Sequence, residues 1–225
     1  IRKHDPYAHP IFLHTLPSDS MRSAILDPLL GYEYLDGISL QQDQREEVAQ
    51  VVQQLATQSR EAGQEWSITM DEIGMWHTGA LTDTADPGHP SLTRHALWGS
   101  LLSGAAGVEW YFGGLHVHND LNSEDWRQRD QLWEITTNAK GFFETYLPYW
   151  EMQPAHELVE SGEGFCLRKK GEIYAFYLAD YQSQTLDLKA ETGSYAVHWF
   201  DPWEGGELQR GSKQIIQASS ALNPG

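Results

Sequence analysis

The sequence predicts an α/β region followed by a small all-β module. In residues 10–112, short apolar strands alternate with segments whose apolar residues recur at helical spacing, a pattern typical of parallel β/α units. Further along the chain, the pattern changes to short strands separated by turn residues such as Asp-Pro and Gly-Gly pairs. The change falls in the Pro154–Gly164 segment, so we expect one domain at 1–158 and a second at 159–225.

Four strands and three helices are expected in the first part. The strands are short apolar runs at Pro10–Leu16, Leu35–Gln41, Trp66–Asp71 and Val108–Phe112. The helices are expected at 43–63, 90–104 and 123–146. Asp43 and Glu46 form a capping-box-like start for the first helix, and Asn122 or Ser123 can cap the third.

The all-β part is expected to begin with a hairpin. The run GFCLRKKGEIYAFYLA predicts two strands that turn at Lys170-Gly171. Further short strands are expected in TLDLK, YAVHWF, GELQRG and KQIIQ.

Charge and cysteine content narrow the functions to consider. The formal net charge is −17 at pH 7, and the one basic cluster, LRKKGE, fits a hairpin turn, so no nucleic-acid partner is expected. No apolar run reaches the length of a membrane span. The single cysteine, Cys166, lies in a strand-like run and is expected to be a small buried side chain.

Polar residues follow the predicted parallel strands. In such folds, the loops at the carboxyl ends of the strands build the active site. The residues at these positions are His14-Thr15, Gln41-Gln42, Asp71-Glu72 and the stretch 109–114. Glu72 is the best-defined candidate because its long carboxylate can reach into the mouth of such a site. The alternative is a loop acid that pairs with an arginine, and Asp71 is expected to be structural, through hydrogen bonds to loop amides.

Aromatic residues and a histidine lie near the same positions. His77 can line the cleft or orient a carboxylate, although a surface histidine fits the pattern equally well. Trp76 and Trp110 can form a stacking platform for a sugar ring, because a flat aromatic face matches the CH face of a pyranose. Core packing is the default alternative for any single tryptophan.

A metal site is the weaker interpretation of the loop after the fourth strand. His116 and His118 form a His-x-His pair, a spacing that binds zinc or iron in some barrel hydrolases. A metal site needs three or four converging ligands, and no further histidine belongs to a recognisable motif. The NDLNSED segment could supply oxygen ligands to calcium, but a helix cap explains it without metal. No metal and no cofactor are therefore expected.

Several motifs resemble one family of bacterial hydrolases. The matching text is MDEIG, LWGSLLSGAAGVEWYFG, HNDLNSEDWRQRD and YAVHWFDPWEGGEL. These motifs are similar to the C-terminal portion of clan A glycoside hydrolases whose barrel precedes a β-module labelled collagen-binding. The resemblance implies that the four strands are strands five to eight of a (β/α)₈ TIM barrel, followed by a small β-sandwich.

The same resemblance implies a function. Glu72 falls on the position of the nucleophile of a retaining glycosidase, and His14, Gln41, Trp76, His77 and Trp110 become candidates for substrate binding. The family's acid/base glutamate follows an asparagine, and this chain has no Asn-Glu pair, so that residue is expected in an N-terminal barrel half outside this fragment. A carbohydrate substrate and a secreted or periplasmic location are implied.

Two other functions stay open. The barrel could be an inactive scaffold for a β-module that binds glycan or matrix protein. The protein could also be a metal-dependent hydrolase that uses His116 and His118.

Overall fold

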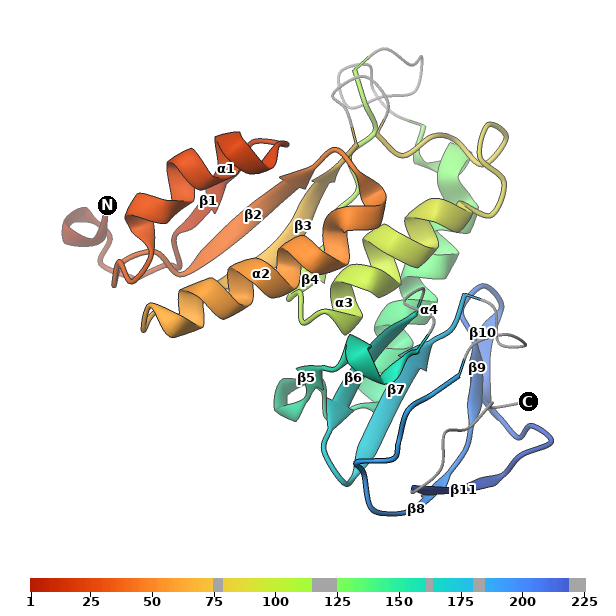
Figure 1. Cartoon of the computed structure of the whole chain (residues 1–225). Coiled ribbons are helices and arrows are strands. Elements are labelled where there is room, and N and C mark those ends of the chain that lie inside the picture. The colour runs from red at the N-terminus through yellow and green to blue at the C-terminus, as the bar shows by residue number, and fades with distance from the viewer. Residues whose placement is uncertain (75–78, 115–124, 161–163, 180–184, 219–225) are drawn as a thin grey trace.

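A parallel sheet forms the frame of the first part of the chain. The computed structural model describes residues 1–74, 79–114, 125–160, 164–179 and 185–218. Its four-stranded parallel sheet has the order β1-β2-β3-β4 (Figure 1). The strands are β1 (Phe12–His14), β2 (Gly37–Gln42), β3 (Ser67–Ile73) and β4 (Gly107–Val108). The predicted parallel β/α order is confirmed, whereas closure into a barrel stays a prediction.

The fourth strand is shorter than the sequence predicts. The expected range was Val108–Phe112, but β4 ends at Val108. The reason lies in the backbone partners: the carbonyl of Tyr111 accepts a hydrogen bond from the amide of Ala80, at 2.6 Å, instead of continuing the ladder with β3. The segment after β4 is therefore held by the loop that follows β3.

Helices connect the strands, and most of them were expected. They are α1 (Asp19–Leu26) with η2 (Asp27–Leu29), η3 (Arg45–Glu47) with α2 (Val48–Glu61), the π-helical η4 (Leu92–Gly99) with α3 (Ser100–Leu102), and η5 (Trp126–Arg129) with α4 (Asp130–Tyr146). Short 3₁₀ turns lie at η1 (Arg2–His4), η6 (Tyr149–Glu151) and η7 (His156–Leu158). Helix α1 was not predicted, because it is short and only Arg22 and Leu26 are buried on it.

The helix that ends in α4 starts later than its predicted cap. The carboxylate of Asp125 accepts a hydrogen bond from the amide of Arg127 and caps η5. The predicted caps, Asn122 and Ser123, lie outside the described residues. Among the described residues, no helix combines the length and the apolar character needed to cross a membrane.

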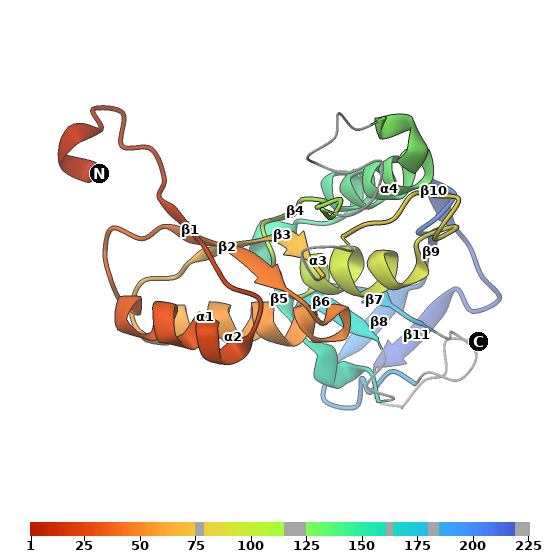
Figure 2. The same cartoon turned by 90° about the horizontal axis from the view of Figure 1, so that it is seen from above.

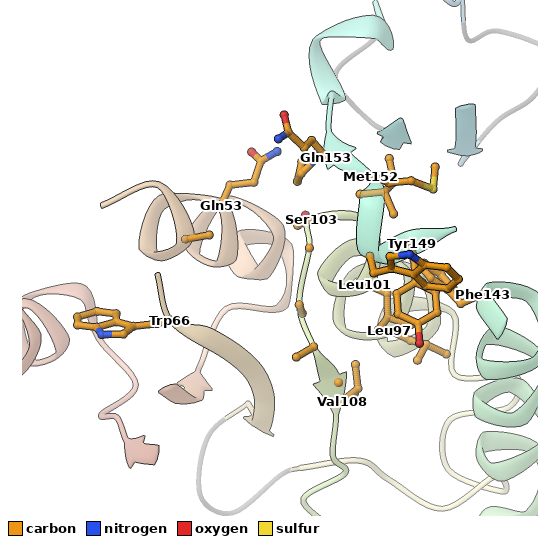
Figure 3. A pocket seen from close by; sticks show the side chains of 18 of the residues that line it. Gln53, Trp66, Leu97, Leu101, Ser103, Val108, Phe143, Tyr149, Met152 and Gln153 are labelled. Atoms are coloured by element: carbon orange, nitrogen blue, oxygen red, sulfur yellow. The ribbon is translucent and has the colours of Figure 1, made fainter. Parts of the chain in front are cut away.

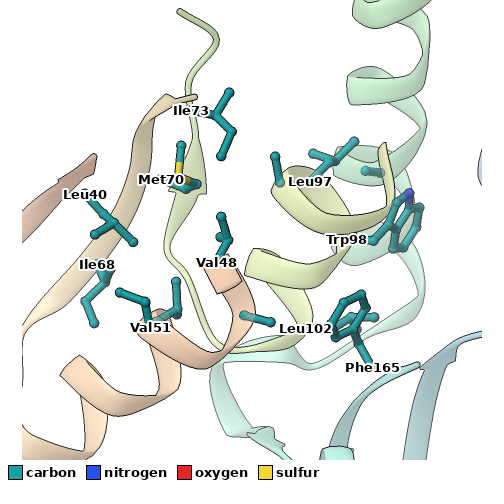
Figure 4. Close-up of a cluster of buried hydrophobic side chains, with 14 of the residues drawn as sticks. Leu40, Val48, Val51, Ile68, Met70, Ile73, Leu97, Trp98, Leu102 and Phe165 are labelled. Atoms are coloured by element: carbon teal, nitrogen blue, oxygen red, sulfur yellow. The ribbon is translucent and has the colours of Figure 1, made fainter. Parts of the chain in front are cut away.

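The sheet is covered by helices on one face. Helices α1 and α2 lie on the same side of β1, β2 and β3 (Figure 2). The side chains between sheet and helices form a dense apolar core (Figure 4) that includes Ile38, Leu40, Ile68, Met70, Ile73, Val48, Val51 and Leu102. Alternate residues of the same strands, such as Ser39 and Thr69, point to the other face and are only half-buried.

The second part of the chain is antiparallel. A three-stranded sheet has the order β5 (Gln153–Pro154), β6 (Phe165–Lys169) and β7 (Ile173–Tyr177). Two-stranded sheets pair β9 (Trp199–Asp201) with β10 (Gly205–Gln209), and β8 (Gly193–Ala196) with β11 (Ile215–Ala218). The predicted all-β character is confirmed, whereas the β-sandwich and the 158/159 boundary stay predictions.

Individual predictions for the second part had different outcomes. The turn at Lys170-Gly171 is confirmed, and Gly171 has the left-handed φ of 78° that favours glycine. YAVHWF is not one strand but parts of β8 and β9, since the chain changes partner from β11 to β10. TLDLK forms only an isolated bridge between Leu186 and Val159. Cys166 is fully buried as expected, and burial raises the pKa of its thiol well above the ordinary range.

An aromatic cluster around Trp98 joins the two parts. Trp98 lies on η4, is 3 % exposed, and stacks on Tyr177 of β7 with ring centroids 5.9 Å apart. The rings of Phe142 on α4 and Phe200 on β9 lie 5.4 and 6.1 Å from it. Residues of the parallel and antiparallel parts therefore share one hydrophobic cluster, and a second, smaller cluster lies within the antiparallel part.

A half-buried histidine, His156, makes a second connection. Nε2 of His156 lies 2.8 Å from the hydroxyl of Ser103, which follows α3. Nδ1 of His156 accepts a hydrogen bond from the amide of Cys166 on β6, at 3.0 Å. Because Nδ1 is an acceptor, the imidazole is neutral in this arrangement. Desolvation by burial lowers the pKa of His156, which agrees with the neutral form.

The Trp98 cluster predicts that the two parts unfold together. Trp98→Ala should lower the free energy of unfolding by about 3–5 kcal/mol, because it removes a large buried ring and leaves a cavity. Urea denaturation followed by circular dichroism measures this change. Trp126→Ala is the matched control, since Trp126 is 62 % exposed and its loss should matter little. Separate transitions for the two parts in the wild type would contradict the shared core.

His156 predicts a pH dependence of stability. Its folded-state pKa is lowered, whereas in the unfolded chain it titrates near pH 6.5, so the unfolded state binds more protons as the pH falls. The contribution of His156 to stability is present above about pH 6.5 and is lost below it. As the pH is lowered from 8 to 5, the urea concentration at the midpoint of unfolding should decrease less in His156→Gln than in the wild type. His4→Gln removes an exposed histidine and should leave the slope unchanged; equal slopes in all three proteins would contradict the prediction.

Candidate active site

A β-bulge in β3 determines to which face of the sheet the side chain of Glu72 points. Leu40 pairs with Met70, and the next residue of β2, Gln41, pairs with Glu72, so Asp71 is an extra residue in β3. Ile68 and Met70 point toward the helices, and regular alternation would send Glu72 the same way. The bulge shifts the alternation, so Glu72 instead points to the face that α1 and α2 leave uncovered.

Both carboxylate oxygens of Glu72 have partners from neighbouring strands. Oε1 accepts a hydrogen bond from Nε2 of Gln41 at 2.7 Å. Oε2 lies 3.2 Å from Nε2 of His14 on β1. The side chain of Glu72 keeps 21 % exposure, so the carboxylate is held in place and still accessible. The structure brings together the predicted residues His14, Gln41 and Glu72.

Ser39 orients the imidazole of His14. Its hydroxyl lies 2.8 Å from Nδ1 of His14, on the side of the ring opposite Glu72. Because a carboxylate accepts hydrogen bonds, Nε2 of His14 carries the hydrogen that faces Glu72. Ser39 was not predicted as a site residue, although its place two residues before Gln41 on the same strand face is a usable signal.

Thr15 fixes the backbone of Gln41. Its hydroxyl accepts a hydrogen bond from the amide of Gln41 at 2.9 Å, and its own amide donates to the carbonyl of Ser39 at the same distance. The side chain of Thr15 is fully buried. This residue links the end of β1 to the end of β2 at the point where both contribute to the site.

Arg22 supports the site from the helix side. Its Nη1 donates to Oε1 of Gln42 at 2.9 Å and reaches the carbonyl of Gln41 at 3.3 Å. Its Nη2 pairs with Asp19 within α1. Desolvation lowers the pKa of Arg22, and the carboxylates of Asp19 and Glu47 act in the opposite direction. A guanidinium stays charged at neutral pH, so it can anchor the end of β2.

Asp71 has a structural contact within its own strand. Its Oδ2 accepts a hydrogen bond from the hydroxyl of Thr69 at 2.8 Å, and residues 75–78 of the loop whose amides were expected to bond to it lie outside the described residues. Thr69 and Asp71 lie on the same strand. The bulge thus places a second carboxylate next in sequence to Glu72, with a partner of its own.

For Trp110, the structure favours core packing, the alternative to the predicted sugar platform. Trp110 is 7 % exposed, and its indole Nε1 donates to the hydroxyl of Thr136 on α4 at 2.9 Å. Trp110 lies beyond the end of β4 and belongs to the main hydrophobic core cluster. A ring buried in this way has no free face for a sugar. Trp76 and His77 lie outside the described residues, as do His116 and His118.

The loop after β3 is held by buried polar contacts. Nη2 of Arg45 donates to the carbonyl of Gly79 at 3.1 Å, and Nε of Arg129 donates to that of Ala80 at 2.9 Å. Nε2 of the fully buried His89 lies 2.7 Å from Oδ1 of Asp83. The sequence analysis did not identify these residues, because their partners are distant in the chain or depend on the course of the loop.

The described residues contain no group of three or more His, Cys, Asp or Glu side chains placed to hold a metal ion. No family model, no curated protein and no solved structure matches the chain. The resemblance to clan A glycosidases therefore stays a prediction that rests on the sequence motifs.

Thr15 offers a test of how the site is supported. Thr15→Val keeps the shape of the side chain but leaves the amide of Gln41 without its acceptor, which should lower the free energy of unfolding by about 1–3 kcal/mol. Urea denaturation measures the loss. Thr15→Ser retains the hydroxyl and should recover most of it. If valine is tolerated as well as serine, the Thr15–Gln41 bond does not support the site.

Proposed function

We propose that this chain carries the nucleophile half of a retaining glycoside hydrolase active on a poly- or oligosaccharide. The observation that supports this best is the arrangement at Glu72. One accessible carboxylate stands at the carboxyl edge of a parallel sheet, and side chains from two neighbouring strands hold both of its oxygens. Active sites of parallel β/α folds are built at this edge.

Glu72 would perform the covalent step. Its carboxylate attacks the anomeric carbon, the bond from that carbon to the leaving oxygen breaks, and a glycosyl ester forms on Glu72. A second carboxylic acid, about 5–5.5 Å away, gives its proton to the leaving oxygen. The same group then takes a proton from water, which attacks the ester and releases the sugar with retained configuration. Gln41 and His14 fix the attacking carboxylate during both steps.

The acid/base glutamate is proposed to lie outside this chain. Parallel sheets are normally covered on both faces, whereas in the described residues α1 and α2 cover one face of β1 to β3. The uncovered face carries Glu72, so further β/α units closing against this sheet would bring a second carboxylate into reach. Asp71 is not assigned this role, because it neighbours Glu72 in the bulge and is bonded to Thr69.

Replacing each of the two adjacent acids, Asp71 and Glu72, by its isosteric amide tests whether Glu72 is the nucleophile. In the protein that also contains the second carboxylate, Glu72→Gln should lower kcat on a responsive polysaccharide on the order of 10³-fold or more, because the amide cannot form the glycosyl ester. Asp71→Asn is the matched control and should keep activity within about tenfold of the wild type. Release of reducing sugar from a panel of polysaccharides is the measurement.

Two outcomes would contradict the proposal. Unchanged turnover in Glu72→Gln would remove the nucleophile role. Activity that is lost on chelation and restored by a divalent metal would favour the metal-dependent alternative. In a successful case, mass spectrometry with a slow fluorinated glycoside should find the sugar on the peptide that contains Glu72.

A further inference from the structure

A hollow lies beside β3 and β4, between α2, α4 and β5. It has a volume of about 810 Å³, within the range of small-molecule sites (Figure 3). Trp66, directly before β3, and Ala106, directly before β4, are among its lining residues. Its lining extends along β4 to Val108, which pairs with Met70, but Glu72 is not among the lining residues. The hollow is therefore separate from the candidate active site.

Two exposed aromatic rings stand at this hollow. Tyr149 and Trp150 belong to η6 and are 45 % and 71 % exposed. Their rings meet edge to face at 5.2 Å and 81°. Phe143 of α4 supports the ring of Tyr149 from a centroid distance of 6.2 Å. Adjacent exposed rings held at a fixed angle offer apolar faces to a ligand without having to be ordered first.

Two amide side chains from different elements line the hollow. Gln53 comes from α2 and Gln153 from β5, and Figure 3 shows the two amides extending into the space between these elements. An amide both donates and accepts hydrogen bonds, so it can serve two neighbouring hydroxyl groups of one ligand.

The charged side chains around the hollow neutralise one another. Arg60 pairs with Glu65 at 2.7 Å, and Lys140 pairs with Glu144 at 2.6 Å. All four residues line the hollow, so its walls carry no excess of positive charge. The chain as a whole has a net charge of −17, which further disfavours an anionic ligand. The hollow suits an uncharged ligand with apolar faces and many hydroxyl groups.

We propose that this hollow binds a neutral carbohydrate chain at a site that does not include Glu72. Tyr149 and Trp150 stack on the CH faces of sugar rings, and Gln53 and Gln153 bond to their hydroxyl groups. The volume accommodates a short oligosaccharide better than a single ring. The site holds glycan and has no role in bond cleavage, so it is independent of the function proposed for Glu72.

Titration of the whole chain with neutral oligosaccharides tests the proposal. The panel contains cello-, xylo-, manno- and galacto-oligosaccharides, with an oligogalacturonide as the anionic comparison, and binding is followed by calorimetry and affinity electrophoresis. At least one neutral oligosaccharide should bind, and the oligogalacturonide should not. Trp150→Ala should weaken that binding at least tenfold, and Gln153→Ala should also weaken it. Trp150 is largely exposed, so its replacement should leave the urea midpoint unchanged.

Matched variants separate this site from the candidate active site. Trp126→Ala removes another exposed tryptophan, which does not line the hollow, and it should bind like the wild type. Glu72→Gln should also bind like the wild type, whatever its effect on activity. The proposal is overturned if no neutral oligosaccharide binds, if Trp150→Ala binds as well as the wild type, or if binding is lost in Glu72→Gln alone.

Discussion

A single extra residue in β3, Asp71, determines which way Glu72 points. Without the bulge, the alternation that buries Ile68 and Met70 would also direct Glu72 into the apolar core, where an unpaired carboxylate is strongly unfavourable. With the bulge, the side chain of Ile73 points into the core instead of Glu72. Glu72 then reaches its partners on β1 and β2. The same insertion adds a second acid without disturbing the helix-facing side. The contacts of Glu72 with Gln41 and His14 follow from this shift in the strand.

The site depends on three strands and not on one motif. His14, Gln41 and Glu72 come from β1, β2 and β3, and two side chains that never touch Glu72 hold them in place. Ser39 orients the ring of His14, and Thr15 fixes the backbone of Gln41. Hydrogen bonds of this kind restrict the rotamers of a polar site at the edge of a sheet. The arrangement holds the carboxylate of Glu72 in one orientation.

The sequence predicted the elements better than their details. The apolar runs of the parallel strands and the hairpin at Gly171 were recognisable, because local periodicity and turn chemistry determine them. His14 and Gln41 were found from their position at strand ends. The bulge in β3 was not predicted, because it depends on how β3 pairs with β2. No local sequence pattern reveals that pairing. The burial of Trp110 was not evident for a similar reason: its indole bonds to Thr136 on α4, a partner that no local pattern reveals.

The aromatic cluster at Trp98 has a consequence for how this chain can be divided. Phe142, Tyr177 and Phe200 approach that ring from both sides of the junction, and Trp203 adds a hydrogen bond from its indole to the carbonyl of Gly88. A cut between the two parts would expose a continuous apolar surface on each product. Such surfaces promote aggregation. Neither part is therefore suited to use as an isolated domain. A chimaera that contains one part must also contain the residues that cover the ring of Trp98.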